Sequence, residues 1–269
     1  MFRIISDIGA DIPAELKSSM IIINQDVTID EESVVIDNDE SSMVDFYKRI
    51  DVANTYATRA LRLDEIITLL EREQGKGDIL CFSFSQRLSA TGSQMEKACN
   101  LINGKPNRIV YYDTRTATIG QGIMIYLAQL CNEQGLSIDQ TVDYLRKMET
   151  KLSFYVILDK SSHFFSGGRA ANLSNESLYY PILRLPLGNL YQCTGYALSK
   201  RDAVKYVVQK IRKKTIDIIF IGHGSNKQEA LHLKNELACY ANTIGICYAN
   251  PVMGVHTGDN ALLISFLEK

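Results

Sequence analysis

The sequence predicts an α/β protein with two domains: an N-terminal, mainly parallel sheet with flanking helices, and a C-terminal mixed α/β domain. Two observations carry this prediction. Up to residue 152, apolar segments of strand length alternate with amphipathic segments of helical spacing, which is typical of parallel strands joined by right-handed crossovers. Beyond residue 152, two strand-like segments lie close together without a helix between them, so the second domain is expected to mix strand directions.

The N-terminal domain is expected to span residues 1–152. Its apolar pattern predicts strands over residues 2–6, 20–24, 78–85 and 108–112, and helices over residues 43–50, 63–73, 89–102, 118–133 and 137–151. Ser137 is suited to cap the last of these helices, with Gln140 three residues later as its capping-box partner.

The C-terminal domain is expected to span residues 153–269. The pattern predicts strands over residues 154–158, 181–185, 191–197 and 216–221, and helices over residues 202–213 and 227–240. No Pro- or Gly-rich linker marks the boundary, so we expect the two domains to pack against each other.

Composition narrows the class of protein. A content of 46% hydrophobic and 22% charged residues is typical of a globular protein. The net charge of −2 does not indicate binding to nucleic acid or to an anionic membrane surface. Asp7 interrupts the first apolar segment, so no signal peptide is expected, and no apolar run is long enough for a membrane span. The six cysteines are scattered without a C-x-x-C pair, which favours buried thiols in the cytoplasm over disulfides or a metal site.

The stretch 85–93 joins a predicted strand to a predicted helix and is the most informative for chemistry. Free backbone N–H groups at a helix N-terminus favour an anion, and the hydroxyls of Ser89 and Thr91 could add donors. The alternative is that Ser89 only caps its helix.

Asp7 and His256 are further candidates. Asp7 ends the first strand; an Asx-turn is favoured there over contact with a ligand or action as a base. His256 is expected in a Gly-flanked loop after Pro251, where its imidazole could hydrogen-bond a carboxylate. His223 is a secondary candidate.

Several catalytic and cofactor templates are absent from the sequence. There is no phosphate-binding loop, no dinucleotide fingerprint and no nucleophile elbow, and the histidines do not show metal-ligand spacing. We therefore expect neither a cofactor nor a metal.

Six segments, taken together and in order, resemble the DegV family of bacterial fatty-acid-binding proteins over nearly the whole chain. They are the opening 6–13, Thr58 ahead of 64–66, Leu88-Ser89-Ala90-Thr91, Gly167-Gly168-Arg169, Pro181-Ile182-Leu183 and His256-Thr257-Gly258.

The resemblance implies two α/β domains that enclose one acyl chain, with its carboxylate at the domain junction. It implies a lipid-binding protein, not an enzyme, that could present a long-chain fatty acid to a separate fatty acid kinase for acyl-phosphate formation. The ligand-binding residues that it implies are Thr58, Ser89, Ala90, Thr91, Arg169 and His256.

The chain also departs from the family pattern. Residues 58–62 read Thr-Arg-Ala-Leu-Arg where the family has Thr-Ser-Gln-Pro-Ser, and Tyr180 stands in place of a Lys. The hydroxyls expected to hold the carboxylate are unchanged, whereas neighbouring and partner-facing positions differ from the family pattern. The resemblance therefore supports lipid binding more strongly than partnership with a kinase. Two alternatives stay open: a hydrolase or acyltransferase that uses Ser89 and His256 with an Asp such as Asp7, and a relative that has lost lipid binding.

Overall fold

The computed structural model describes residues 1–34, 40–104, 106–159, 164, 170–171 and 179–269. Its α-helices are α1 (Glu40–Val52), α2 (Leu63–Gln74), α3 (Ala90–Ile102), α4 (Thr118–Glu133), α5 (Ile138–Met148), α7 (Lys200–Ile211), α8 (Lys227–Leu237) and α9 (Pro251–Thr257). Short 3₁₀ turns are η1 (Ala14–Leu16), η2 (Glu149–Lys151) and η3 (Ala238–Tyr240).

The strands form three sheets. A parallel sheet has the order β2 (Ile21–Ile23), β1 (Arg3–Asp7), β6 (Ile79–Ser83), β7 (Ile109–Asp113). A larger, mixed sheet has the order β13 (Thr243–Tyr248), β12 (Ile216–His223), β14 (Leu262–Glu268), β8 (Leu152–Ile157), β10 (Tyr180–Arg184), β11 (Tyr191–Ala197), β9 (Ala170–Ala171). A small antiparallel sheet has the order β4 (Glu32–Val34), β3 (Val27–Ile29), β5 (Tyr56–Thr58). The predicted fold class is confirmed.

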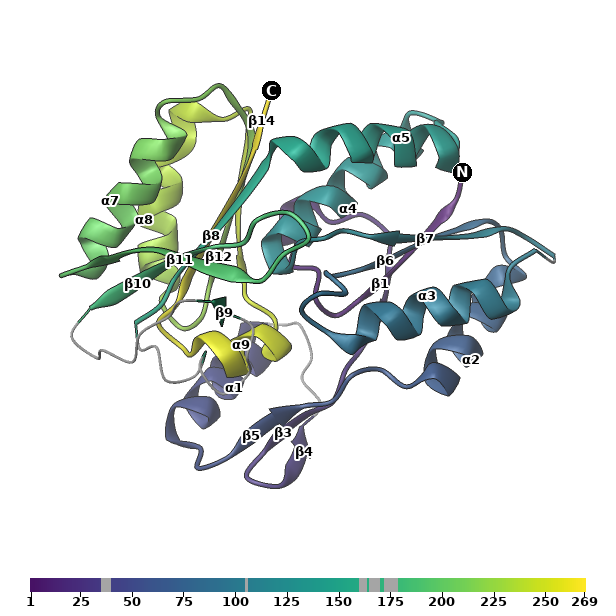
Figure 1. Ribbon diagram of the computed structural model, residues 1–269, viewed down its shortest axis with the longest axis horizontal. Helices are drawn as coiled ribbons and strands as arrows, with labels where there is room; N and C mark the ends of the chain where they lie inside the picture. Colours follow the sequence, from purple (N-terminus) through teal and green to yellow (C-terminus); the bar gives the residue numbers. More distant parts are fainter. Residues whose placement is uncertain (35–39, 105, 160–163, 165–169, 172–178) are drawn as a thin grey trace.

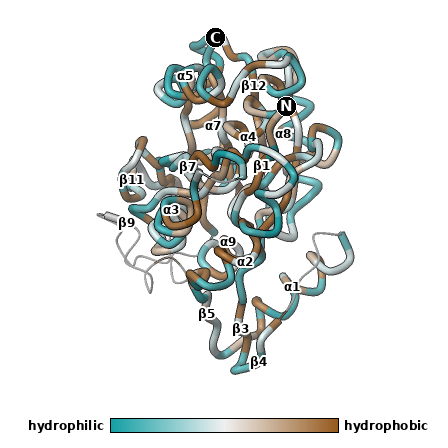
Figure 2. The backbone as a smooth tube through the Cα atoms, turned by 90° about the vertical axis from the view of Figure 1, so that its right-hand side faces the viewer, coloured by the Kyte–Doolittle hydropathy of each residue, from teal (hydrophilic) through white to brown (hydrophobic). Residues whose placement is uncertain are grey.

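Helices and sheets alternate in layers (Figure 1). Helices α2 and α3 pack on one face of the parallel sheet, α4 lies between the parallel and the mixed sheet, and α7 and α8 cover the far face of the mixed sheet. Helix α1 and the antiparallel sheet pack against α9. Figure 2 shows the brown, apolar stretches gathered around β1, β12 and α4.

Helix α4 is apolar nearly all round because it faces a sheet on both sides. Its Gly122 allows a close approach to the loop after β1: a Cβ atom there would lie 1.9 Å from the carbonyl oxygen of Asp11. The next helix, α5, is amphipathic and begins at the predicted capping box of Ser137 and Gln140, which is confirmed.

One local prediction is wrong. His256 lies in the last turn of α9 and not in a loop. Asn250 caps this helix through a 3.0 Å bond from the Met253 N–H, Pro251 occupies its first position, and Gly258 ends it with a φ of +76°. Seven residues are too few to show a helical period in the sequence, so only the cap residues signalled the helix.

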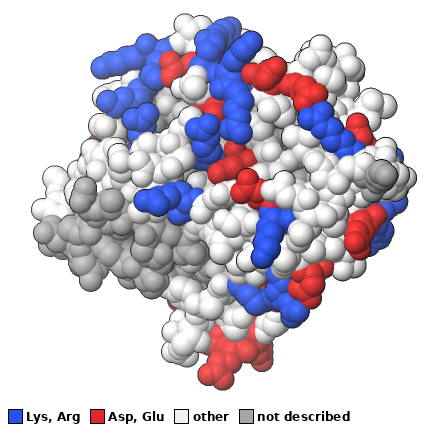
Figure 3. All heavy atoms as spheres, turned by 45° about the vertical axis from the view of Figure 1, so that its right-hand side comes forward, with Lys and Arg blue, Asp and Glu red and all other residues white. Residues whose placement is uncertain are grey.

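The predicted division at residue 152 is compatible with the sheets but stays a prediction. The parallel sheet precedes it and the mixed sheet follows it, while one apolar cluster joins Leu80 and Phe82 of β6 to Phe220 of β12 around α4. All six cysteines are free, and no helix in the described ranges is long and apolar enough to cross a bilayer. Acidic and basic side chains are interspersed on the face shown in Figure 3.

Candidate functional site

A cavity of about 250 Å³ lies where the loop after β1, strand β5 and the first residues of α3 and α4 meet α9. Its lining residues come from the chain before residue 152 and from the chain after it. The carboxyl end of a parallel sheet is where helix N-termini and strand ends converge on ligands, and β1 and β6 both end beside this cavity.

The polar part of the lining includes three residues expected from the sequence. Thr58 ends β5, Ser89 caps α3, and His256 reaches the cavity from α9; all three are half-buried. Helices α3 and α4 both begin at the cavity, and their N-termini contribute partial positive charge. These groups suit an oxygen-rich head group.

The rest of the wall is apolar. Phe84 and Leu88 contribute from one side and Met253 from α9, together with Phe164, Tyr191 and Val252. The ring of Phe164 meets that of Tyr191 edge-on at 5.1 Å between centroids. Such a lining, mostly apolar with a few polar groups, is typical of a site for a small molecule.

Ser89 has two roles in this geometry. Its Oγ accepts a 3.2 Å hydrogen bond from the Thr91 N–H, so the capping interpretation is confirmed, and Ser89 also lines the cavity. Thr91 itself is buried behind the wall, where its Oγ accepts bonds from Gln25 Nε2 at 3.1 Å and from the Leu61 N–H at 3.3 Å. Thr91 therefore holds the lining residue Gln25 in position, whereas Ala90 lines the cavity directly.

Asp7 stabilises the loop that borders the cavity. Its carboxylate accepts bonds from the N–H groups of Gly9 at 3.0 Å and Phe84 at 3.1 Å and from Gln121 Nε2 at 2.9 Å. Burial raises the pKa of Asp7 to about 7, because its effect outweighs that of the hydrogen bonds, which lower the pKa. The expected Asx-turn is present, since the Gly9 N–H donates to the side chain of Asp7 two residues earlier.

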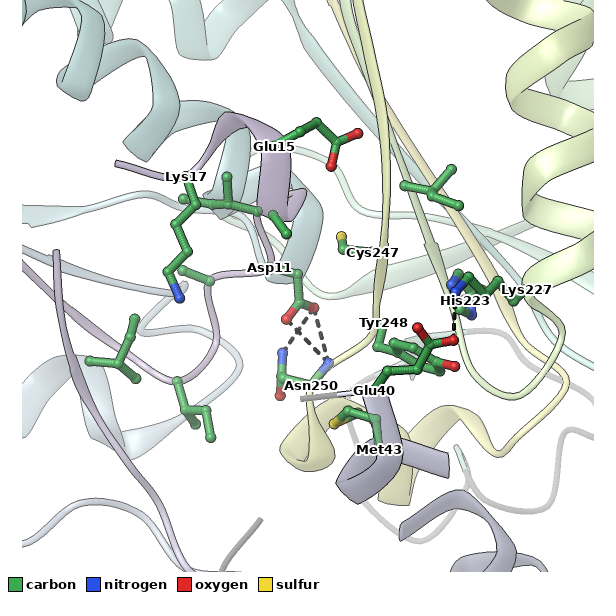
Figure 4. A pocket seen from close by; sticks show the side chains of 16 residues that line it. Asp11, Glu15, Lys17, Glu40, Met43, His223, Lys227, Cys247, Tyr248 and Asn250 are labelled. Atoms are coloured by element: carbon green, nitrogen blue, oxygen red, sulfur yellow. Dashed lines mark hydrogen bonds and ion pairs between the residues drawn. The ribbon is translucent and has the colours of Figure 1, made fainter. Parts of the chain in front are cut away.

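A second cavity of about 380 Å³ lies on the other side of Asn250 and is lined by more charged groups (Figure 4). There Asp11 accepts hydrogen bonds from the Asn250 N–H and from Asn250 Nδ2, the latter at 3.0 Å. Burial raises the pKa of Asp11 to about 8 and lowers that of His223, which also faces this cavity. Asn250 lines both cavities and caps α9, so Asp11 supports the helix that carries His256.

The structure thus brings Thr58, Ser89, Ala90 and His256 together, and it places Thr91 behind them. Arg169 lies outside the described residues. In the part of the chain that the structure describes, no group of His, Cys, Asp and Glu side chains is arranged to hold a metal.

Sequence reasoning missed three polar lining residues: Gln25, Thr118 and Asn250. Gln25 was detectable as a polar residue between two apolar strand segments, and Asn250 as a cap directly before Pro251. Thr118 begins α4 with a φ of +48°, a strained conformation for a β-branched residue that no sequence pattern announces.

Comparison with known proteins gives one consistent match. The family model described as "Uncharacterised protein, DegV family" matches residues 1–269. A DegV domain-containing protein of Clostridium perfringens is 26% identical over 99% of this chain and 97% of its own length.

Solved structures show the same fold. A DegV lipid binding protein from Thermotoga maritima has a TM-score of 0.88 at 17% identity, and a stearic acid-binding protein from Eubacterium ventriosum has 0.87 at 18%. Each alignment covers 100% of this chain and 99% of the other.

Proposed function

Since this chain belongs to the DegV family, we propose that it binds one long-chain fatty acid, with the acyl chain in the cavity and the carboxyl group beside Thr58, Ser89 and His256. The observation that carries the proposal is the cavity in which the hydroxyls of Thr58 and Ser89, the imidazole of His256 and two helix N-termini lie beside a largely apolar wall. The lipid-binding relative from Thermotoga maritima and the stearic acid-binding relative from Eubacterium ventriosum support it.

The tail supplies most of the binding free energy in this proposal. Burying about 15 methylenes at about 0.8 kcal/mol each gives a gross term near 12 kcal/mol. A hydrogen bond to a charged group nets about 1.5–3 kcal/mol. The hydroxyls therefore select the head group, and the apolar wall retains the molecule.

Native mass spectrometry of the purified protein, followed by denaturation and analysis of released lipid, tests the proposal. We expect a stoichiometric mass excess that resolves into a free fatty acid. A protein that is empty and that also takes up no added fatty acid contradicts the proposal.

Ser89→Ala is expected to reduce the preference for a free fatty acid over its methyl ester about fivefold or more, while lipid uptake persists, because one head-group donor is lost and the tail contacts remain. The variant also loses a helix cap, which costs about 1 kcal/mol of stability. Competition binding with the acid and the ester measures the preference.

Ser199→Ala is the matched control. Ser199 caps α7, and its Oγ accepts a bond of 3.2 Å from the Asp202 N–H, the same length as at Ser89. It should lower stability to a similar extent and leave ligand preference unchanged. An unchanged preference in Ser89→Ala would remove Ser89 from the head-group site.

Presentation of the bound acid to a separate fatty acid kinase is a further part of the proposal, as is the absence of catalysis by this chain itself. The family resemblance and the lack of a phosphate-binding loop in the sequence support both. A pull-down from the host should recover an ATP-binding partner; recovery of no kinase-like protein speaks against this part. A cytoplasmic location, supported by six free cysteines, completes the proposal.

A further inference from the structure

His223 ends β12 and lines the second cavity, of about 380 Å³, which is separate from the proposed fatty acid cavity. Among the described lining residues the two cavities share Asn250 alone. His223 is 1% exposed, and its ring lies 4.4 Å from the ring of Tyr248 between centroids. Figure 4 shows both side chains at the end of the cavity opposite Lys17. The proposed binding of a fatty acid uses neither side chain.

The hydrogen bond of His223 determines which of its ring nitrogens can accept. Nδ1 lies 2.7 Å from the carbonyl oxygen of Gly224. A carbonyl oxygen can only accept, so Nδ1 carries the ring proton. Burial lowers the pKa of His223, which keeps the ring neutral at pH 7. Nε2 is therefore an acceptor, and its partner must be a donor.

Nε2 of His223 has no hydrogen-bond partner in the part of the chain that the structure describes. It is not fully enclosed by protein atoms either, so a group in the cavity can reach it. Buried polar groups nearly always have a partner, which comes from the protein, from ordered water or from a bound molecule. A free acceptor on the wall of a cavity therefore points to a ligand that carries a donor.

The charged groups near His223 are already paired with one another. Nζ of Lys227 forms an ion pair with Glu40, and both face the same cavity. Glu15, which also lines it, pairs with Nζ of Lys234 at 3.4 Å. An ion that entered beside His223 would lose its hydration without gaining an unpaired counter-ion. An uncharged donor avoids this penalty.

The remainder of the wall suits an apolar body. Ile22, Met43 and Ile246 are among the apolar residues that line the cavity. Burial raises the pKa of Asp11 to about 8, so this carboxyl group is mostly protonated at pH 7. Lys17 is exposed, and its flexible side chain can remain in solvent. The lining thus combines apolar side chains with compensated charges and one free acceptor.

We propose that this second cavity binds a small uncharged alcohol, whose hydroxyl group donates to Nε2 of His223 while its apolar body packs against the isoleucine and methionine side chains. An ether of the same composition has no donor and leaves Nε2 unpaired. An ammonium group or a carboxylate must be desolvated beside groups that are already paired. The site is independent of the proposed fatty acid function.

The test compares hexan-1-ol with its isomer pentyl methyl ether, with hexylammonium and with hexanoate, at pH 7. Calorimetric titration uses the unaltered protein with one equivalent of dodecanoic acid, so that the fatty acid cavity is filled. The alcohol should bind about tenfold more tightly than the ether, because the ether leaves a buried acceptor unsatisfied. It should also bind more tightly than either ion. An ether or an ion that binds as tightly as the alcohol overturns the inference.

Nitrogen-15 NMR of the labelled histidines reads the hydrogen bond directly. The Nε2 resonance of His223 should start at the position of an unprotonated ring nitrogen and move to lower chemical shift when hexan-1-ol is added. His232 is exposed on α8 and does not line this cavity, so its resonances should stay in place. A proton on Nε2, or a His223 resonance that the alcohol does not move, contradicts the proposal.

His223→Phe should lower the affinity for hexan-1-ol about tenfold and leave that for the ether unchanged, because an aromatic ring remains and the acceptor is lost. His232→Phe is the control and should bind both as the unaltered protein does. If His223→Phe does not fold, the ligand series and the NMR spectrum still decide. A protein that binds dodecanoic acid but not hexan-1-ol overturns this inference alone, and one that binds hexan-1-ol but no fatty acid overturns the proposed function alone.

Discussion

Ala117→Phe is expected to lower the affinity for a long-chain fatty acid more than 100-fold while the protein stays folded. Ala117 lines the cavity, is buried, and has an extended backbone that accepts an aromatic residue. The ring would occupy space that the tail needs. Excluding only four methylenes removes about 3 kcal/mol of burial, which corresponds to a factor above 100. Displacement of a fluorescent fatty acid measures the loss.

The substitution should disturb the fold little. Ala117 makes no side-chain capping bond, and the new ring enters a cavity instead of a filled core. Ala14→Phe is the matched control, since Ala14 lines the second cavity. If Ala14→Phe lost binding while Ala117→Phe bound normally, the acyl tail would lie in the second cavity and the proposed site would be wrong.

Asp11→Asn is expected to remove a large pH dependence of stability. The pKa of Asp11 is about 8 in the folded protein, against 3.8 as its ordinary value. Between these values the unfolded chain carries the ionised form and the folded protein the protonated form. Stability therefore falls by up to about 1.4 kcal/mol per pH unit as the pH rises, and the loss ends near pH 8.

Urea unfolding at pH 5, 6, 7 and 8 measures this effect. From pH 5 to pH 7 the Asp11 contribution is at most about 3 kcal/mol, and Asp11→Asn should remove it. Asp7 has a pKa of about 7, so it also makes the free energy of unfolding fall as the pH rises. This contribution remains in Asp11→Asn. Asp45→Asn, an exposed position on α1, is the control. Parallel pH profiles for the wild type and Asp11→Asn would show that Asp11 is ionised in the folded protein.

Local patterns explain which parts of the fold the sequence predicts. The strands and helices around β6 and β7 alternate at regular spacing, and helix 118–133 was predicted with the bounds that α4 has. The small sheet β4-β3-β5 was missed because its strands have three residues each, too few to show alternation. Strands β13 and β14 were missed as well.

The candidate site divides in the same way. Ser89 was predictable because it lies between a buried strand and a helix, and His256 because it lies in a Gly-flanked stretch after Pro251. Thr58 came from the family resemblance. Gln25 and Thr118 reach the cavity only because the loop after β2 lies beside Thr91 and because the backbone at Thr118 is strained. Both depend on contacts between distant segments, which a single sequence does not display.

The position of β14 sets the order in which the molecule can assemble during synthesis. It is the last strand in chain order, yet it lies between β12 and β8 in the middle of the mixed sheet. A ribosome that has released only the first 250 residues has delivered the whole parallel sheet but neither β14 nor α9. Helix α4 then lacks the cover that β14 supplies, and the cavity lacks the residues that α9 contributes. The gap between β12 and β8 closes only when residues 262–268 are available to pair with both strands.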